Sequence, residues 1–546
     1  MQKFKNGKQA KRLQHNKYNQ YNNYNNIEEF KNLTPVNGLD YQNLENARQN
    51  NYCWSMSELD DYIYVGTGRN ILLVILQSYF SEDLNIPTSI YAPNQDNRAE
   101  IWRYKKDYPN SWERVFKVED EREFGFRYMI NFRPFNGNPA LYAASAVTSG
   151  YLQVYKSVNG VVWEPVLSDI EPSGTIIGTS SRAMLVHRGK LYLAAINEAL
   201  GQGQQTLLYS SKDPEFFPWE LETPAGTNPN RNPQGGITNM AVFNNRIYVA
   251  TSTDDGVQVW RTNGPEPRVN DWTLVVDSFG DNAYTLSIGV FKDYLYVSGT
   301  KELPLAWAIP RGCDIIRIDE NDDYEVVVGP GSESRIWSGF NNPFNVYAWQ
   351  MQEYNGKFYV STFDDATNMQ LILELLLANR EELPLSDRII NILIGIYELV
   401  VELLNRFKYP FGFDLYVSRN GVDFEPVFLN GLGNRYNYGG RILYVDSEDD
   451  LYIGTANPYE GLEVWKALSY GNGHCNHHCE CGSCGYWDED HGEHDGNANF
   501  INYNEYDFDA MRQELEKEFM KLDLYMDQIR EYLQPLFTRY TVKKER

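Results

Sequence analysis

The chain has 546 residues, 42% of them hydrophobic, which is enough to bury a large core and excludes general disorder. Aromatic residues make up 14% of the sequence, a bias typical of β-strands. The formal net charge of −25 repels nucleic acid and anionic lipid headgroups, so we expect neutral or cationic partners over most of the surface.

The first segment, residues 1–28, is rich in Asn, Gln, Lys and Tyr and has no apolar periodicity, as in a disordered interaction arm. No apolar run follows the basic stretch at residues 1–12, so we expect neither a signal peptide nor a transmembrane segment. The default location is therefore the cytoplasm, with surface association left open. Four of the six cysteines crowd into one short segment, which disfavours a disulfide framework across the body.

A repeat organises residues 29–470. An apolar run centred on a tyrosine and followed by small residues recurs seven times, each time between other short apolar or aromatic strands. Four strands of alternating pattern per copy are typical of a propeller blade, so we predict an all-β fold, a seven-bladed β-propeller of four-stranded blades. The central tyrosines are Tyr64, Tyr142, Tyr192, Tyr248, Tyr296, Tyr359 and Tyr452.

The seventh copy lacks the last strand of its blade. Residues 30–36 resemble the corresponding strand of the sixth copy, near Phe424. We therefore predict that this N-terminal segment completes the seventh blade and closes the ring, which removes the exposed sheet edges.

Two insertions, residues 71–99 and 368–410, interrupt the loop between the second and third strands of their blades. Because this loop is the same in both blades, we expect the insertions on one face. The larger insertion contains apolar helical stretches at 371–378 and 389–407. It is either a helical hairpin that caps its own blade or a lid or docking surface beside the channel.

Residues 471–500 form an acidic linker rich in Cys and His. Thiolates and imidazoles suit tetrahedral zinc or cuprous copper, and their close spacing favours ring closure. Disulfides or a linker without metal are the alternatives. The candidate ligands are Cys475, Cys479, Cys481, Cys484, His474, His477 and His478.

The C-terminal segment, residues 501–546, has apolar residues at helical spacing between 508 and 529. Its polar face is mixed in charge rather than basic, which disfavours membrane binding. We expect this helix to pack against the propeller or against a second copy of the chain.

Two turns ahead of aromatic strands share a pattern, residues 157–163 and 418–424, with Ser, Asn and Gly before Trp163 and Phe424. The pattern resembles the Asp-box, or BNR, repeat of sialidase-like β-propellers. In that repeat a Ser and an Asp organise the hairpin, and Gly supplies a positive φ. Asn replaces Asp in both turns here. The box is structural in that family, so the resemblance implies a fold and no activity.

A site similar to that of the sialidases needs arginines that clamp a carboxylate, a Tyr and Glu pair for attack and an Asp as general acid. The family's arginine followed by Ile and Pro is absent here. Arginines and tyrosines do occur where a propeller directs side chains into its central funnel; the arginines could instead pair with blade carboxylates. The predicted ligand-binding residues are Arg127, Arg182, Arg441, Tyr52, Tyr284, Tyr347 and Tyr438.

These patterns favour a non-enzymatic binding or scaffolding protein that presents a loop-rich face to a protein or glycan ligand, with an accessory metal site. One alternative is a glycosidase-like enzyme acting on an anionic glycan. The other is a metal-storing or metal-sensing protein in which the propeller only supplies bulk.

Overall fold

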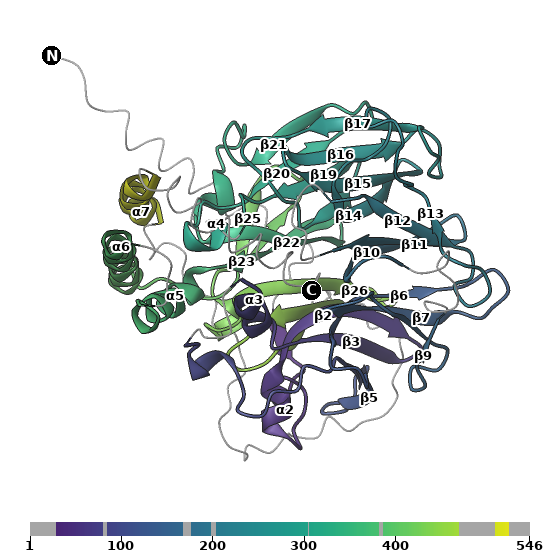
Figure 1. The fold of residues 1–546 in the computed structure, drawn as a ribbon, viewed down its shortest axis with the longest axis horizontal. Coiled ribbons are helices and arrows are strands. Elements are labelled where there is room, and N and C mark those ends of the chain that lie inside the picture. Colours follow the sequence, from purple (N-terminus) through teal and green to yellow (C-terminus); the bar gives the residue numbers. More distant parts are fainter. Residues whose placement is uncertain are drawn as a thin grey trace, which may run out of the picture.

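The computed structural model describes residues 29–79, 85–166, 176–197, 204–303, 305–381, 386–468 and 508–523. The predicted N-terminal arm, the Cys/His-rich linker with its candidate metal ligands and most of the C-terminal segment lie outside these residues. Within them the protein is mostly β, with antiparallel strands and helices gathered at one end (Figure 1).

The strands follow one another in antiparallel runs in which each strand pairs with the next. The first three runs are β2 (Asn50–Leu59), β3 (Tyr62–Arg69), β4 (Glu100–Lys105) and β5 (Glu113–Lys117); β6 (Glu123–Phe132), β7 (Ala140–Val147), β8 (Val154–Ser157) and β9 (Glu164–Pro165); and β10 (Ser180–His187), β11 (Lys190–Ile196), β12 (Leu207–Ser211) and β13 (Glu220–Leu221).

The same pattern continues along the chain. The next three runs are β14 (Gly236–Phe243), β15 (Arg246–Thr253), β16 (Gly256–Thr262) and β17 (Trp272–Asp277); β18 (Ile288–Phe291), β19 (Tyr294–Gly299), β20 (Asp314–Ile318) and β21 (Tyr324–Val328); and β22 (Asn345–Tyr354), β23 (Lys357–Asp364), β24 (Leu415–Ser418) and β25 (Phe424–Phe428).

The last run joins both ends of the strand-bearing chain. It consists of β26 (Gly439–Val445), β27 (Leu451–Ala456), β28 (Val464–Leu468) and β1 (Glu29–Asn32). Phe30 lies opposite Ala467, so the N-terminal segment pairs where the sequence predicted. The strand ends at Asn32, earlier than predicted, because the Asn32 side chain accepts the backbone N–H of Thr34 and Pro35 has no N–H to donate.

The hydrogen-bonded ladder does not form one closed sheet among the described residues. Strands β14–β17 and β18–β21 are separate four-stranded sheets. The other twenty strands connect through single pairings between neighbouring runs, such as Gly68 with Gly125 and Tyr52 with Ala456. Side-chain packing, rather than backbone pairing, therefore carries most of the contact between runs.

The repeated tyrosines explain part of that packing. All seven are at most 2% exposed. The hydroxyl of Tyr64 lies under the turn at Gly160 in the next run, where a Cβ would overlap it, and Tyr296 meets Gly421 in the same way. Each turn glycine also has a positive φ, +71° and +78°. A glycine is thus needed at both turns for space and for conformation.

The two Asp-box-like turns are organised by asparagine. Asn159 Oδ1 accepts the backbone N–H groups of Val161 and Val162, each at 2.9 Å. Asn420 Oδ1 does the same for Val422 and Asp423. The amide oxygen therefore performs the hydrogen bonding that the resemblance assigns to an aspartate.

The described chain also forms helices and 3-10 turns, and most of the helices lie at one end of the strands, on the left of Figure 1. They are α2 (Leu44–Gln49), α3 (Ile71–Tyr79), α4 (Leu305–Ala308), α5 (Ala366–Ala378), α6 (Asp387–Arg406), α7 (Phe508–Asp523), η1 (Thr88–Ile90), η3 (Ser338–Asn341) and η4 (Gly431–Gly433). The larger insertion forms two helices, as predicted, and the two insertions touch: the Asn85 N–H donates to Asn379 Oδ1 at 2.6 Å. None of the described helices combines the length and apolarity that crossing a membrane requires.

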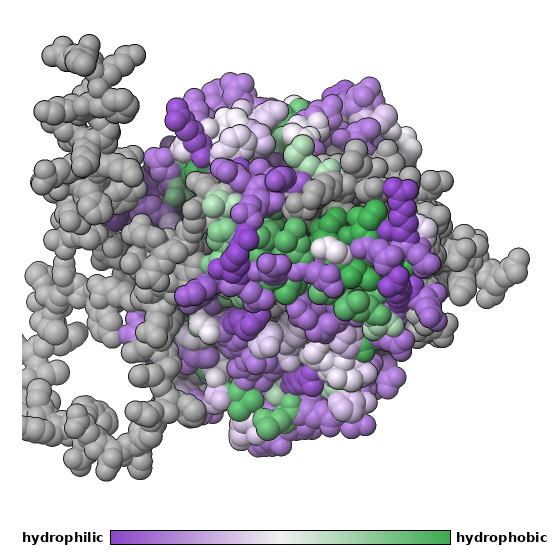
Figure 2. Space-filling view, turned by 90° about the vertical axis from the view of Figure 1, so that its left-hand side faces the viewer, coloured by the Kyte–Doolittle hydropathy of each residue, from purple (hydrophilic) through white to green (hydrophobic). Residues whose placement is uncertain are grey.

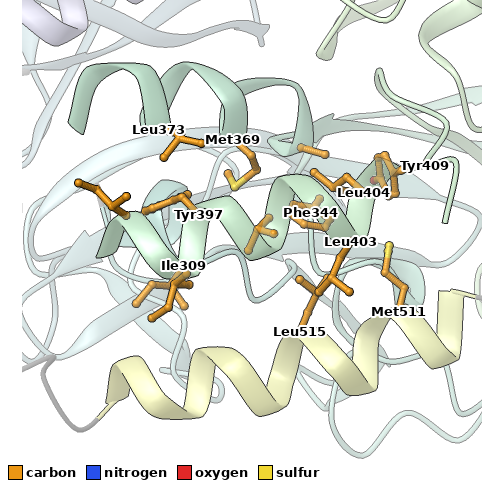
Figure 3. Packing of buried hydrophobic residues seen from close by; sticks show 14 of the residues in the cluster. Ile309, Phe344, Met369, Leu373, Tyr397, Leu403, Leu404, Tyr409, Met511 and Leu515 are labelled. Atoms are coloured by element: carbon orange, nitrogen blue, oxygen red, sulfur yellow. The ribbon is translucent and has the colours of Figure 1, made fainter. Parts of the chain in front are cut away.

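Helix α6 lies between α5 and α7 (Figure 3). Met511 and Leu515 of α7 join a buried apolar cluster with Leu403 of α6. Arg406 and Glu514 form an ion pair across the same interface. The C-terminal helix therefore packs on the helical insertion rather than on the strands. Figure 2 shows hydrophobic residues gathered in the middle of this end of the molecule, bordered by hydrophilic ones.

If β1 is an integral strand, removing its core side chain will destabilise the protein. Phe30 is buried and contacts Phe428 edge-on with ring centroids 5.5 Å apart. We expect Phe30→Ala to lower the apparent free energy of unfolding by about 3–5 kcal/mol, measured by guanidinium denaturation. Lys31→Ala, which alters the exposed neighbour in β1, is the control. Equal denaturation midpoints for the two variants would contradict an integral β1.

Candidate functional site

A β-bulge recurs at the same register in the first strands of six runs. In each run the second strand carries the repeated tyrosine, and its second and third residues after that tyrosine pair with two residues of the first strand. Between those two residues the first strand has one extra residue. A bulge re-aims its extra side chain and increases the local twist. The bulged residues are Trp54, Arg127, Arg182, Thr238, Trp349 and Arg441.

The small residues after each tyrosine have a physical reason. A Cβ at Gly66 would collide with Ser55 Oγ, and one at Gly454 would collide with Cys53 Sγ. Gly66 and Gly454 occupy the second position after Tyr64 and Tyr452, opposite the bulge. The missing Cβ at Gly66 leaves room for Ser55 of the facing bulged strand, whereas the missing Cβ at Gly454 leaves room for Cys53 of β2 in the neighbouring run.

All three predicted arginines occupy bulges. Arg127 donates to Ser180 Oγ at 3.3 Å and lies 5.1 Å from the ring centroid of Trp54. Arg441 lies 5.4 Å from the ring centroid of Trp349. Each of these two guanidinium groups is thus held against an indole from another bulge, a favourable cation–π arrangement.

Arg441 forms no ion pair with an Asp or Glu of the residues that the structure describes. Its side chain is half-buried, and Nε has no hydrogen-bond partner within the described chain. Burial, followed by the positive charge of nearby Arg182, lowers the pKa of Arg441 to about 10. The guanidinium is still protonated at neutral pH, so two like charges converge in a partly desolvated place. Such an arrangement favours the binding of an anion beside the two guanidinium groups.

The predicted tyrosines also share a register. Tyr52, Tyr284 and Tyr347 each pair with the fourth residue after a repeated tyrosine, namely Gly68, Thr300 and Phe363. Tyr52 and Tyr347 are therefore two residues from the bulged Trp54 and Trp349. Tyr438, one residue ahead of β26, joins this layer through a hydrogen bond between its hydroxyl and that of Tyr52.

This tyrosine layer is packed rather than open. Tyr52, Tyr347 and Tyr438 are buried, and Tyr347 stacks on Phe363 with centroids 4.9 Å apart. Burial raises the pKa of Tyr52 and of Tyr438, although Arg441 and Arg127 are close enough to Tyr52 to oppose the shift. A raised pKa disfavours the phenolate, so neither hydroxyl is activated as a nucleophile.

Trp54 and Trp349 were not among the predicted site residues. They carry no charge, so a search for ligand-clamping groups passed over them. Their spacing was informative, because each follows a predicted tyrosine by two residues. Within the residues that the structure describes, no group of three or more His, Cys, Asp or Glu side chains is arranged to hold a metal ion.

No family model matches the chain, and no curated protein matches it either. Solved structures match at low identity. The GH74 xyloglucanase from Xanthomonas campestris is 13% identical with a TM-score of 0.41, covering 80% of this chain and 53% of the other. A puromycin-hydrolyzing peptidase of Mycobacterium tuberculosis is 10% identical with a TM-score of 0.42, covering 79% and 53%. The chain thus spans about half the length of these two proteins.

A neuraminidase-like protein of subtype N10, from the virus A/little yellow-shouldered bat/Guatemala/060/2010, also matches. It is 10% identical with a TM-score of 0.32, covering 62% of this chain and 93% of the other. Similarity of this degree assigns no activity to the present chain.

The buried charge of Arg441 predicts that removing this side chain stabilises the protein, whereas most substitutions of partly buried residues destabilise it. We expect Arg441→Met to raise the free energy of unfolding by about 1–3 kcal/mol, because it removes a desolvated cation and its repulsion with Arg182. Chemical denaturation in phosphate-free, low-salt buffer measures it. Arg133→Met, at an exposed site, should change little. A loss of stability in Arg441→Met larger than in the control would show that the guanidinium is already neutralised.

Proposed function

We propose that this chain is a seven-bladed β-propeller whose central channel binds an anionic ligand without turning it over. The observation that carries the proposal is the convergence of bulged arginines around the half-buried, unneutralised Arg441. Each antiparallel run serves as one blade, and β1 completes the last one. The helical end then forms the face that a protein or glycan partner meets, and its apolar surface supports that role (Figure 2).

The repeated register supports the blade assignment. In a propeller the first strand of each blade lines the channel, so residues at one register form a ring around the axis. The bulged residues would be one such ring, and the tyrosine layer would be the next. Neighbouring positions in the ring are then the Trp and Arg pairs that the contacts join, Trp54 with Arg127 and Trp349 with Arg441.

The chemistry of the ring favours an oxyanion. A guanidinium presents a planar fork of donors that matches a carboxylate or phosphate, and its bonds strengthen where water is displaced. The chain as a whole is strongly acidic, with a net charge of −25, so it repels anions over most of its surface. A cluster of arginines is therefore the place where an anionic ligand would bind. A carboxylate-bearing small molecule or acidic glycan terminus is the ligand class that we propose.

Binding ranks above glycoside hydrolysis. The enzyme alternative needs an activated nucleophile and an acid beside the arginines, whereas burial raises the pKa of both Tyr52 and Tyr438. The largest cause of the lowered Arg441 pKa is burial, followed by the charge of Arg182, and the groups that oppose the shift most are the Cys53 thiol and the phenols of Tyr52 and Tyr128. Recognition without turnover fits this combination.

The ligand proposal predicts a loss of affinity in one variant. Calorimetric titration with citrate, glucuronate and N-acetylneuraminate should detect at least one complex in the wild type. Arg441→Met should weaken it by about 10- to 100-fold, because a charge-assisted hydrogen bond contributes about 1.5–3 kcal/mol. Arg133→Met should bind as the wild type does.

The same probes separate the alternatives. Fluorogenic glycosides of the two acidic sugars should be bound and left intact, and their hydrolysis would establish the enzyme instead. Two outcomes would contradict the channel site. One is equal affinity of the wild type and Arg441→Met for every ligand that binds, and the other is no binding of any probe at millimolar concentration.

We also propose an accessory metal site in the Cys/His-rich segment, which lies outside the described residues. The proposal rests on four thiols and three imidazoles within eleven residues. Because ligation needs deprotonated thiols, binding should release protons and weaken as pH falls. The blades have their own cores, so metal removal should leave the melting temperature of the strands unchanged.

Elemental analysis tests the metal site. The reduced wild type should contain about one zinc or cuprous ion per chain. A variant with Cys475, Cys479, Cys481 and Cys484 changed to Ser should contain none. Equal metal content in the two proteins would remove the proposal.

A further inference from the structure

A buried acidic residue begins the third strand of several runs or directly precedes it, and two runs show how such an acid is neutralised. The residue five positions after the repeated tyrosine faces it. In the first run Arg69 lies 3.4 Å from Glu100, both fully buried. In the fifth run Lys301 lies 2.6 Å from Asp314. A cation thus neutralises the acid in both cases.

The run that carries the large insertion departs from this rule. The position of Arg69 and Lys301 is occupied by Asp364, and the facing acid is Asp414. Both carboxylates are buried. Neither forms an ion pair with a lysine or arginine of the described chain. Two facing carboxylates without a cation cannot both stay ionised at low cost.

Hydrogen bonds join the two acids into one network. The Tyr409 hydroxyl donates to Asp364 Oδ2 at 2.6 Å and accepts from Asn342 Nδ2 at 2.7 Å. Asp414 Oδ2 accepts from Asn345 Nδ2 at 2.7 Å and from the Tyr416 hydroxyl at 3.0 Å. These donors favour the ionised carboxylates but supply no positive charge, so with no cation among the described residues a proton is the simplest neutralising group.

The network lies at both roots of the helical insertion. Asp364 is the last residue of β23, and its Oδ1 accepts the N–H of Ala366, the first residue of α5, at 2.8 Å. Tyr409 follows the end of α6 and packs in the same apolar cluster as α5, α6 and α7. The charge of the pair therefore acts where the helical layer joins the strands.

We propose that Asp364 and Asp414 share a proton, and that its loss loosens the attachment of the helices α5, α6 and α7 to the strands. The insertion is then a pH-sensitive element, and this does not depend on the channel site. The titratable groups that face the pair are Asp365, Tyr409 and Tyr416, with Tyr397 close to Asp365.

The electrostatics support this geometry. Burial raises the pKa of Asp414 to about 7, against the opposing bonds from Asn345, Tyr416 and Asn342. Burial, and then the charge of Asp414, raise the pKa of Asp364 well above its ordinary value. Since the folded-state pKa values exceed the unfolded ones, the stabilisation is complete below about pH 4 and is lost as the pH rises toward about 7.

Hydrogen exchange of the full-length protein between pH 5.5 and 8.5, corrected for the intrinsic rate, tests the proposal. Protection of residues 366–378 and 387–406 should fall at least tenfold with rising pH in the wild type. Protection of β7 and β8 should stay constant. In the double variant Asp364→Asn/Asp414→Asn, which leaves neither acid, the change should shrink to less than threefold. Glu398→Gln, on the exposed face of α6, should behave as the wild type.

Two results would overturn the proposal. One is constant protection of the insertion in the wild type over this range. The other is a change in the double Asn variant as large as that of the wild type. These experiments use buffers with a chelator. If the wild-type protection changes with pH only in a parallel series with calcium and no chelator, a metal cation rather than a proton neutralises the pair, and the proposal is wrong.

Discussion

The arrangement of this protein depends on one backbone feature, the β-bulge in the first strand of successive runs. The bulge inserts a residue opposite two small residues. A Cβ at Gly66 would collide with Ser55 of the facing strand, and one at Gly454 would collide with Cys53 of the neighbouring run. The repeated tyrosine then marks the register, since in six runs its second and third successors face the bulge. A single constraint thus sets both the small residues of the repeat and the direction of the side chains at the centre.

The same register carries different chemistry in different runs. Bulges hold Arg127, Arg182 and Arg441 in the second, third and seventh runs and Trp54 and Trp349 in the first and sixth, while Thr238 in the fourth carries neither charge nor ring. A symmetric scaffold with asymmetric side chains is an economical way to build a binding site, because the backbone geometry is settled before the ligand contacts diverge.

Buried acids show a second divergence within the repeat. Arg69 and Lys301 neutralise Glu100 and Asp314 directly, whereas Glu463 is held by amides, with Asn437 Nδ2 at 2.8 Å. The facing pair Asp364 and Asp414 accepts hydrogen bonds from amides and hydroxyls but has no cationic partner among the described residues, and it coincides with the root of the largest insertion. A buried polar group that is incompletely neutralised is costly, so its position at a junction between helices and strands suits a conformational role.

The amino-acid sequence by itself determined the repeat, the contribution of Phe30 to the last run and the two helices of the large insertion. These follow from local periodicity, and side chains that alternate or recur at helical spacing need no knowledge of distant contacts. It also placed all three arginines in first strands. The bulges, the indoles beside Arg127 and Arg441 and the packing of α7 on α6 were decided only in the tertiary structure. So was the meeting of Asp364 with Asp414, fifty residues apart, because register between strands and contact across an insertion depend on how distant segments pack, which no local pattern records.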